Sequence, residues 1–246
     1  MLPISCTILT KNAARTLKKT LDALTDFDEV VILDSGSSDA TLKIASLYPN
    51  VNIHHSPFLG FGPQHNLATS LAKHDWVLSI DGDEIVTSKL SQRLKGLTLN
   101  PDAVYSFPRL NILYGKKIRF SGWYPDRVCR LYHRKKTSFS LDQVHEKIIS
   151  QGLKEIQLHE QIEHYSYLDA RDFLNKMQVY TDLYKEQHPY RKVSFFTVMI
   201  HTLFGFIKPY VIKLGFLDGV QGLIIALYQA QTAYYKYLKL WESSHR

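Results

Sequence analysis

Cysteine is scarce in this chain of 246 residues: Cys6 and Cys129 are the only two, and they lie far apart in apolar stretches. Two distant cysteines argue against a disulfide framework. The sequence has no CxxC pair or Cys/His cluster, which argues against a structural zinc site. We therefore expect both thiols to be reduced and buried, as in a cytoplasmic protein.

Other missing features exclude further classes. No basic segment precedes an apolar run in residues 1–12, so we do not expect a signal peptide there. The absence of GxxxxGK[ST] excludes a P-loop enzyme. The most apolar segment, residues 193–241, never reaches 18 uncharged residues, so we do not expect a simple membrane span. The interruptions are Lys208, Pro209, Lys213 and Asp218.

Charge is unevenly distributed along the chain, whose net charge is +7. Residues 1–100 are near neutral, whereas residues 109–136 carry nine basic side chains and one acid. Residues 191–246 carry seven basic and two acidic side chains. Such surfaces attract diphosphates, nucleic acid or anionic lipid, and a merely solvated basic face explains them equally well. Charge alone therefore leaves the partner open.

Short β-rich runs alternate with helical periodicity through the first 90 residues. The predicted strands cover residues 4–9, 29–34, 51–55 and 76–80. The intervening helices are expected to start near Asn12, Asp39 and Pro63. This alternation predicts an α/β fold with a mainly parallel sheet, in which ligands bind beyond the C-terminal ends of the strands. Thr10, Asp34 and Asp81 occupy such ends, and we expect them to converge on one crevice.

The pattern changes after residue 100. Residues 103–139 are rich in aromatic, basic and turn-forming residues, which predicts an antiparallel elaboration at the sheet edge. Residues 168–188 have the periodicity of an amphipathic helix. The predicted organisation is one domain over 1–190, with halves 1–100 and 101–190, and a helical extension over 191–246.

The fourth predicted strand runs directly into acidic residues, in the sequence WVLSIDGDE. A spacing of two would place Asp81 and Asp83 on the same side of an extended chain, and Gly82 would let a ligand approach the backbone. Two adjacent carboxylates repel unless a cation neutralises them, and their oxygens suit Mg²⁺ or Mn²⁺. A DxD sequence is common in solvated turns, but its place at a strand end favours a metal site.

Three segments resemble family 2 glycosyltransferases of the GT-A fold in order and spacing: CTILTKNAARTLKKTL, EVVILDSGSSDAT and GFGPQHNLATSLAKHDWVLSIDGDE. Later segments, GWYPDRVCRLYHRK, VHEKI and HYSY, are similar to the lipopolysaccharide inner-core β-1,4-glucosyltransferase subgroup. The resemblance implies an inverting transfer of a sugar, with glucose expected, from a nucleotide diphosphate, with UDP expected. It implies a saccharide acceptor linked to a lipid.

The resemblance assigns roles by position. Thr10 and Asp34 would hold the nucleotide, although the usual pair of acids after the second strand is reduced here to Asp34 and Ser35. The residues expected to bind the nucleotide sugar are Thr10, Asp34, Gln64, Asn66, Asp81, Arg127 and Arg130. Asp83, Asp81 and His164 would bind the divalent cation, Mg²⁺ or Mn²⁺. Glu84 would bind that metal through water or stand at a helix start.

A carboxylate must remove the proton of the acceptor hydroxyl. We favour Glu146, with Asp126 as the alternative and Asp142 as a turn former. Glu146 follows His145 in a short strand-like run, where adjacent side chains point to opposite faces. A simple surface ion pair with Lys147 is the competing interpretation of Glu146.

The apolar and basic extension predicts peripheral attachment to the cytoplasmic face of the inner membrane, where a lipid-linked acceptor would be presented. A helical cap packed on the catalytic domain and a dimer interface are the alternatives. Two other functions stay open: a metal-dependent nucleotidyltransferase, although its Gly-rich basic loop is missing, and a non-catalytic binder of sugar nucleotides. Nucleic acid is not expected as a partner, because the basic residues form no recognisable binding module.

Overall fold

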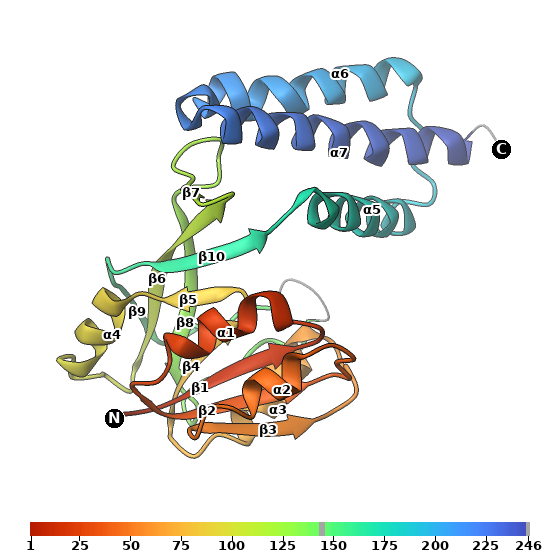
Figure 1. Ribbon diagram of the computed structural model, residues 1–246. Helices are drawn as coiled ribbons and strands as arrows, with labels where there is room; N and C mark the ends of the chain where they lie inside the picture. Colours follow the sequence, from red (N-terminus) through yellow and green to blue (C-terminus); the bar gives the residue numbers. More distant parts are fainter. Residues whose placement is uncertain (143–145, 245–246) are drawn as a thin grey trace. The chain divides into compact units, whose positions relative to one another are not determined.

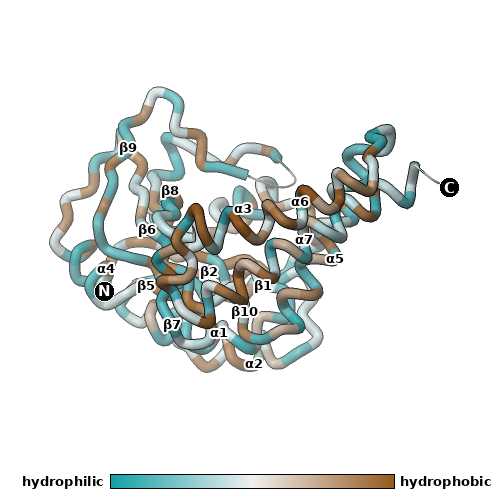
Figure 2. The backbone as a smooth tube through the Cα atoms, turned by 90° about the horizontal axis from the view of Figure 1, so that it is seen from above, coloured by the Kyte–Doolittle hydropathy of each residue, from teal (hydrophilic) through white to brown (hydrophobic). Residues whose placement is uncertain are grey.

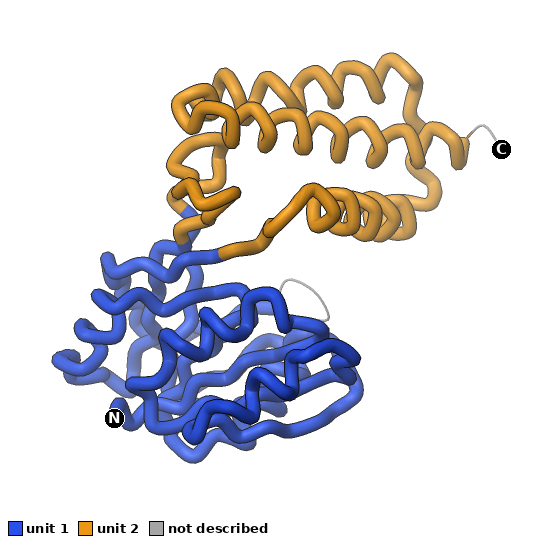
Figure 3. Tube along the Cα trace, viewed as in Figure 1, with its two compact units in different colours: residues 1–109, 126–164 blue, residues 110–125, 165–246 orange. Residues whose placement is uncertain are grey.

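The computed structural model describes residues 1–142 and 146–244 (Figure 1). The expected strand-like run that contains His145 therefore lies partly outside the described residues. The chain divides into two compact units, which are described separately (Figure 3). Unit 1 comprises residues 1–109 and 126–164, and unit 2 comprises residues 110–125 and 165–246. The sequence analysis expected boundaries at residues 100 and 190. The division differs from these because residues 110–125 and the helix expected at 168–188 belong to unit 2.

The parallel sheet predicted from the alternating pattern forms the centre of unit 1. Its strands are β1 (Leu2–Thr10), β2 (Phe27–Asp34), β3 (Val51–His55) and β4 (Trp76–Asp81). They lie in the order β3-β2-β1-β4 and all run parallel. The connecting helices are α1 (Ala14–Asp22), α2 (Thr41–Ala45) and α3 (Phe61–Ser70). Helices α1 and α2 cover one face of the sheet and α3 the other (Figures 1 and 2).

The antiparallel elaboration is also confirmed. The remaining strands are β5 (Glu84–Val86), β6 (Ala103–Leu113), β7 (Lys116–Lys117), β8 (Asp126–His133), β9 (Lys154–Gln157) and β10 (Ile162–Tyr167), with helix α4 (Ser88–Lys95) between β5 and β6. Strand β8 runs antiparallel to both β4 and β6, and β10 runs antiparallel to β5. Strand β9 is the exception, because it pairs with β6 in parallel.

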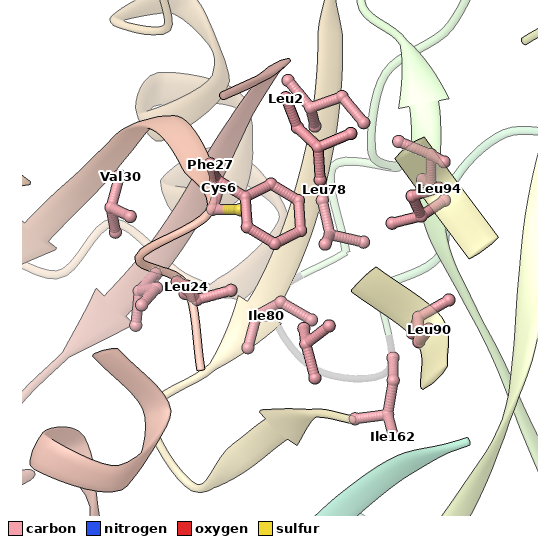
Figure 4. Packing of buried hydrophobic residues seen from close by; sticks show 14 of the residues in the cluster. Leu2, Cys6, Leu24, Phe27, Val30, Leu78, Ile80, Leu90, Leu94 and Ile162 are labelled. Carbon is pink, nitrogen blue, oxygen red and sulfur yellow. The ribbon is translucent and has the colours of Figure 1, made fainter. Parts of the chain in front are cut away.

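Apolar side chains from both faces of the sheet explain why these segments pack together. Figure 4 shows residues of β1, β2, β4, α4 and β10 gathered in one cluster. Cys6 and Phe27 belong to this cluster and are fully buried. Val31 and Val77 face the opposite side in a second cluster. The two cysteines are free thiols, as expected, but only Cys6 is buried and Cys129 is half-buried. Burial is the main cause that raises the pKa of Cys6.

The helix α1 was expected to start near Asn12 with Asn12 as its cap, but Asn12 does not cap it. Its backbone adopts a left-handed conformation, with φ of 56°, and its side-chain oxygen accepts a hydrogen bond from Ser38 N at 2.8 Å. The N-cap of α1 is Ala13, without a side-chain cap. Asp39 instead accepts a hydrogen bond from Ala14 N at 3.1 Å. Tertiary contacts with the loop after β2 therefore replace the local cap.

Unit 2 is mainly helical. Its helices are α5 (Ala170–Gln187), α6 (Phe195–Ile207) and α7 (Val220–Ser244), with a π-helical turn (Lys208–Ile212) and a 3₁₀ turn (Gly215–Asp218) between α6 and α7. The amphipathic helix predicted at 168–188 is α5, and Asp169 caps it with a capping box. Helices α6 and α7 cross closely at Gly205, where a Cβ would lie 3.1 Å from that of Ala233.

Lys208 and Pro209 do not stop the helix that precedes them. The π-helical turn carries it on to Ile212, since a wider turn accommodates proline, which lacks a backbone N–H. Among the described residues, Phe195–Ile212 is one helical segment long and apolar enough to cross a bilayer. Length and composition alone do not separate a spanning helix from one that lies in an interface.

Candidate active site

The polar residues at the ends of β1 and β2 lie together, as predicted. Thr10 Oγ1 donates a hydrogen bond to Asp34 Oδ2 at 3.0 Å. Asp34 also accepts hydrogen bonds from the backbone N–H groups of Gly36 at 3.1 Å and Ser37 at 2.9 Å. Burial raises the pKa of Asp34, but these hydrogen bonds outweigh it and the pKa is lowered. Asp34 is therefore an ionised residue that shapes the loop after β2.

Gln64 and Asn66 lie on α3 and contact different segments. Gln64 Nε2 donates to Ser35 Oγ at 3.0 Å, next to Asp34. Asn66 instead pairs with the backbone of Phe139: its Nδ2 donates to the carbonyl at 3.0 Å, and its Oδ1 accepts from the N–H at 2.9 Å. Gln64 thus supports the loop after β2, whereas Asn66 holds the segment before Glu146.

The acidic residues after β4 do not follow an extended chain. Strand β4 ends at Asp81, Gly82 and Asp83 form a turn, and β5 starts at Glu84. The expected extended chain is therefore wrong, because a turn separates Asp81 from Asp83. Asp81 Oδ2 contacts Arg130, whereas Asp83 Oδ2 lies 3.5 Å from His164 Nε2.

Arg130 lies at the centre of these acids. Its Nη2 donates to Asp81 Oδ2 and to Glu84 Oε1, the latter at 2.6 Å. Glu84 is fully buried, and Arg109 Nη1 lies 3.3 Å from the same oxygen. Burial raises the pKa of Asp81, but the charge of Arg130 outweighs it and the pKa is lowered. Glu84 is therefore a buried partner of two arginines and does not stand at a helix start.

Asp126 and Arg127, adjacent in β8, make separate contacts. Asp126 Oδ2 accepts from Arg109 Nε at 2.8 Å and lies 2.8 Å from Arg109 Nη2. Arg127 donates to the backbone carbonyls of Ser106 at 3.2 Å and Leu158 at 3.1 Å. The guanidinium of Arg127 thus links the strand β6 to the end of β9, whereas Asp126 belongs to the network of acids and arginines.

Glu146 has a neighbour that the sequence analysis missed. His65 Nε2 lies 3.7 Å from Glu146 Oε1, and His65 Nδ1 lies 3.2 Å from Ser79 Oγ. The signal for His65 was its position between Gln64 and Asn66, both already singled out. Asp142 accepts a hydrogen bond from Ser140 Oγ at 2.8 Å.

The described residues contain no group of three or more His, Cys, Asp or Glu side chains arranged to hold a metal ion. Asp83 and His164 nevertheless form a carboxylate and imidazole pair that suits one divalent cation. Asp81 differs, because its Oδ2 contacts Arg130, although its side chain is 39% exposed. Asp83 and His164 are therefore the two side chains that fit a divalent cation.

In an α/β fold, ligands bind beyond the C-terminal ends of the parallel strands, which is where Thr10, Asp34 and the acidic turn after β4 lie. Residues 5–154 match the family model described as glycosyl transferase family 2, and the chain belongs to that family. An uncharacterised glycosyltransferase of Rickettsia conorii is 28% identical, over 98% of this chain and 90% of that protein. A lipopolysaccharide core biosynthesis glycosyltransferase, LpsC of Rhizobium meliloti, is 29% identical over 61% of this chain and 58% of that protein.

The fold is that of GT-A glycosyltransferases, as predicted. The mannosyltransferase PcManGT from Pyrobaculum calidifontis, solved in complex with GDP-Man and Mn²⁺, matches with a TM-score of 0.50. The match covers 94% of this chain and 73% of that one at 15% sequence identity. At this identity the likeness concerns the arrangement of strands and helices.

Proposed function

We propose that this chain is an inverting glycosyltransferase that moves glucose from UDP-glucose to a saccharide of lipopolysaccharide core or a related envelope glycolipid. The observation that carries the proposal is the acidic turn at the end of β4, in a family 2 chain whose β1 and β2 end at Thr10 and Asp34. The likeness to LpsC supports the acceptor class. The PcManGT complex supports a nucleotide-sugar donor and a divalent cation.

The ends of β1 and β2 form the nucleotide side of the proposed site. Asp34 is ionised and buried, and both of its carboxylate oxygens accept hydrogen bonds, so we propose that it acts by fixing the loop after β2 against which the nucleotide lies. Gln64 is fully buried and donates to Ser35 Oγ, so we propose that it supports the same loop. Asn66 and Arg127 have backbone partners, so we propose that they support the site without binding the donor.

Asp83 and His164 are the residues that would hold the cation. When bound, a divalent cation neutralises the charge that gathers on the departing diphosphate. Arg130 does not take that role in our proposal, because its guanidinium is buried between Asp81 and Glu84. It instead neutralises these two acids and fixes the end of β4, so that Asp81 is oriented before substrate binds.

Glu146 is the proposed general base. Asp126 already accepts a hydrogen bond from Arg109 Nε and forms an ion pair with the same guanidinium, whereas Glu146 Oε1 lies 3.7 Å from the imidazole Nε2 of His65. In the proposed reaction Glu146 takes the proton of the acceptor hydroxyl as its oxygen attacks the anomeric carbon, and UDP leaves.

The first test is release of UDP from UDP-glucose, UDP-galactose and UDP-GlcNAc in the presence of Mn²⁺ and saccharide acceptor. We expect turnover by the wild-type chain and a loss of about 100-fold or more in Asp83→Ala, because charge stabilisation of the leaving group is typically worth that much. Asp102→Ala is the matched control, since the Asp102 side chain is 68% exposed and forms a surface ion pair with Lys136 at 2.9 Å.

The outcome also separates the alternatives. A nucleotidyltransferase would release pyrophosphate in place of UDP, and a non-catalytic binder would bind UDP-sugar without turnover. Equal activity of Asp83→Ala and the wild-type chain would contradict the proposed cation site.

We also propose that α6 attaches the protein to the cytoplasmic surface of the inner membrane. Its sequence from Phe195 to Ile207 contains no Asp, Glu, Lys or Arg, yet much of it is exposed. Figure 2 shows hydrophobic residues recurring along α6 and α7. Phe196, Ile200 and Leu203 are exposed by 73%, 48% and 61% and share one helix face at spacings of four and three.

Charge favours an anionic lipid surface over water or a second protein. Lysines flank α6 at Lys192, Lys208 and Lys213. The acid nearest to it in the following segment, Asp218, is buried and accepts hydrogen bonds from the backbone N–H groups of Arg119 and Phe120. An exposed apolar face bordered by cations is typical of helices that lie in the headgroup layer.

The double substitution Ile200→Asp and Leu203→Asp should reduce binding to phosphatidylglycerol vesicles at least about tenfold. Each residue would lose the burial of a large apolar side chain, worth about 1.5–3 kcal/mol, and would gain a repelled charge. Vesicle flotation measures the effect, with Leu47→Asp as control, because Leu47 is 72% exposed in unit 1. Undiminished flotation of the double variant would contradict attachment through α6.

A further inference from the structure

We propose that His65 is a positioning residue, whose imidazole holds the Glu146 carboxylate in the orientation from which it takes the acceptor proton. This inference rests on the proposed function, in which Glu146 is the general base. No motif of the sequence analysis assigned a role to His65.

His65 is buried between two functional elements. It lies on α3, is 2% exposed, and stacks on the ring of Phe139 with centroids 4.3 Å apart and an angle of 14°. Its Nδ1 lies 3.2 Å from Ser79 Oγ on β4, two residues before Asp81. Its Nε2 lies 3.7 Å from Glu146 Oε1. The imidazole therefore spans the distance from β4 to the proposed base.

The partners of the two ring nitrogens determine which one carries the proton. Burial is the main cause that lowers the pKa of His65 to about 4, so the ring is neutral near pH 7. A carboxylate only accepts hydrogen bonds, whereas a hydroxyl donates or accepts. Both contacts are satisfied when Ser79 donates to Nδ1 and the Nε2–H group points at Glu146. The 3.7 Å distance exceeds a hydrogen bond, and such catalytic contacts commonly shorten when substrate binds.

The chain before Glu146 is held against the helix that carries His65. Asn66 forms two hydrogen bonds with the backbone of Phe139, at 2.9 and 3.0 Å. Gly62 N donates to the carbonyl of Asp142 at 3.1 Å. A Cβ at Gly62 would lie only 2.9 Å from that carbonyl oxygen, so this approach requires glycine.

The chain after Glu146 is held to the same segment. Ser140 N donates to the carbonyl of Lys147 at 2.8 Å, and Lys147 N donates to Ser140 Oγ at 3.1 Å. Phe139 and Ile148 form an antiparallel β-bridge. The segments on both sides of Glu146 are therefore held to α3, one directly and the other through this bridge. These hydrogen bonds explain why Glu146 faces His65.

The test compares two substitutions of His65 in UDP release by the full chain. His65→Phe keeps a ring on Phe139 but removes both nitrogens, and we expect kcat to fall about 10- to 100-fold, the cost of a misplaced catalytic group. The KM for the sugar nucleotide should change less than about twofold, because His65 faces the general base Glu146 and does not hold the donor. His65→Gln, whose amide N–H replaces the Nε2–H group, should recover most of the activity.

A second comparison separates positioning from a purely structural role. In a Glu146→Gln background, His65→Phe should lower kcat less than about twofold further, because it acts through the carboxylate that is already removed. The inference would be overturned if His65→Phe kept the wild-type kcat or if His65→Gln failed to recover activity. It would also be overturned if the kcat losses of His65→Phe and Glu146→Gln multiplied in the double variant. If the wild-type chain released no UDP, the proposed function would fail, and this inference with it.

Discussion

Replacing Arg130 by methionine is expected to lower the free energy of unfolding by about 3–5 kcal/mol, the cost of leaving a buried charge without its partner. Glu84 is fully buried, and Arg130 is its shortest ionic contact at 2.6 Å. Burial lowers the pKa of Arg130, but Asp81 and Glu84 outweigh it and raise the pKa, so the guanidinium stays charged. Urea unfolding followed by circular dichroism measures the change.

Two further variants test the cause of this loss. Lys135→Met should leave the free energy of unfolding nearly unchanged, since Lys135 is 68% exposed and its pair with Asp75 lies at the surface. Adding Glu84→Leu to Arg130→Met should restore part of the stability, because it removes the stranded charge. A fall as small as that of Lys135→Met would contradict the buried network.

Glu146→Gln is expected to lower kcat by about 100- to 10,000-fold, the usual contribution of a general base. Affinity for UDP should stay within about twofold of the wild-type value, because Glu146 does not hold the nucleotide in our proposal. The measurement is UDP release at saturating donor, together with calorimetric titration of UDP.

Asp126→Asn provides the comparison for that result. Asp126 forms an ion pair with Arg109, which in turn lies near Glu84, so its loss should disturb the network more than the proton transfer. We expect a smaller fall in kcat together with a lower melting temperature. A larger fall in Asp126→Asn than in Glu146→Gln, with melting unchanged, would make Asp126 the base.

The parallel half of the fold could be predicted from the sequence because its signals are local. The run VNIHH is strand β3 at the predicted bounds, and Thr10, Asp34 and Asp81 end their strands. Alternating apolar runs and helical periodicity suffice for such units. The antiparallel part was predicted in kind, but the parallel pairing of β9 with β6 depends on partners about 50 residues apart and leaves no local pattern.

The candidate site was predicted less completely, since its charges are set by distant partners. Arg130 was expected to bind the nucleotide sugar, but it is buried between Asp81 and Glu84, which lie 49 and 46 residues earlier in the chain. The turn at Gly82 and Asp83 also depends on a distant partner, because it places Glu84 next to Arg130. His65 was missed, since a lone histidine on a helix gives no sign of the carboxylate that it faces.

The division into units also follows from long-range contacts. The loop 110–125 belongs to unit 2 because Asp218 accepts hydrogen bonds from the backbone of Arg119 and Phe120. Lys116 Nζ also donates to the carbonyl of Asp218 at 2.6 Å. A change in composition near residue 190 could not reveal these contacts.

The most direct measurement of the central claim is calorimetric titration of UDP into the protein with Mn²⁺ and again with EDTA. We predict that Mn²⁺ tightens binding at least about tenfold in the wild-type chain, equivalent to about 1.4 kcal/mol, and that Asp83→Ala abolishes this gain. Equal UDP affinity with Mn²⁺ and EDTA, or an undiminished gain in Asp83→Ala, would contradict the claim that the acidic turn after β4 binds a nucleotide diphosphate through a divalent cation.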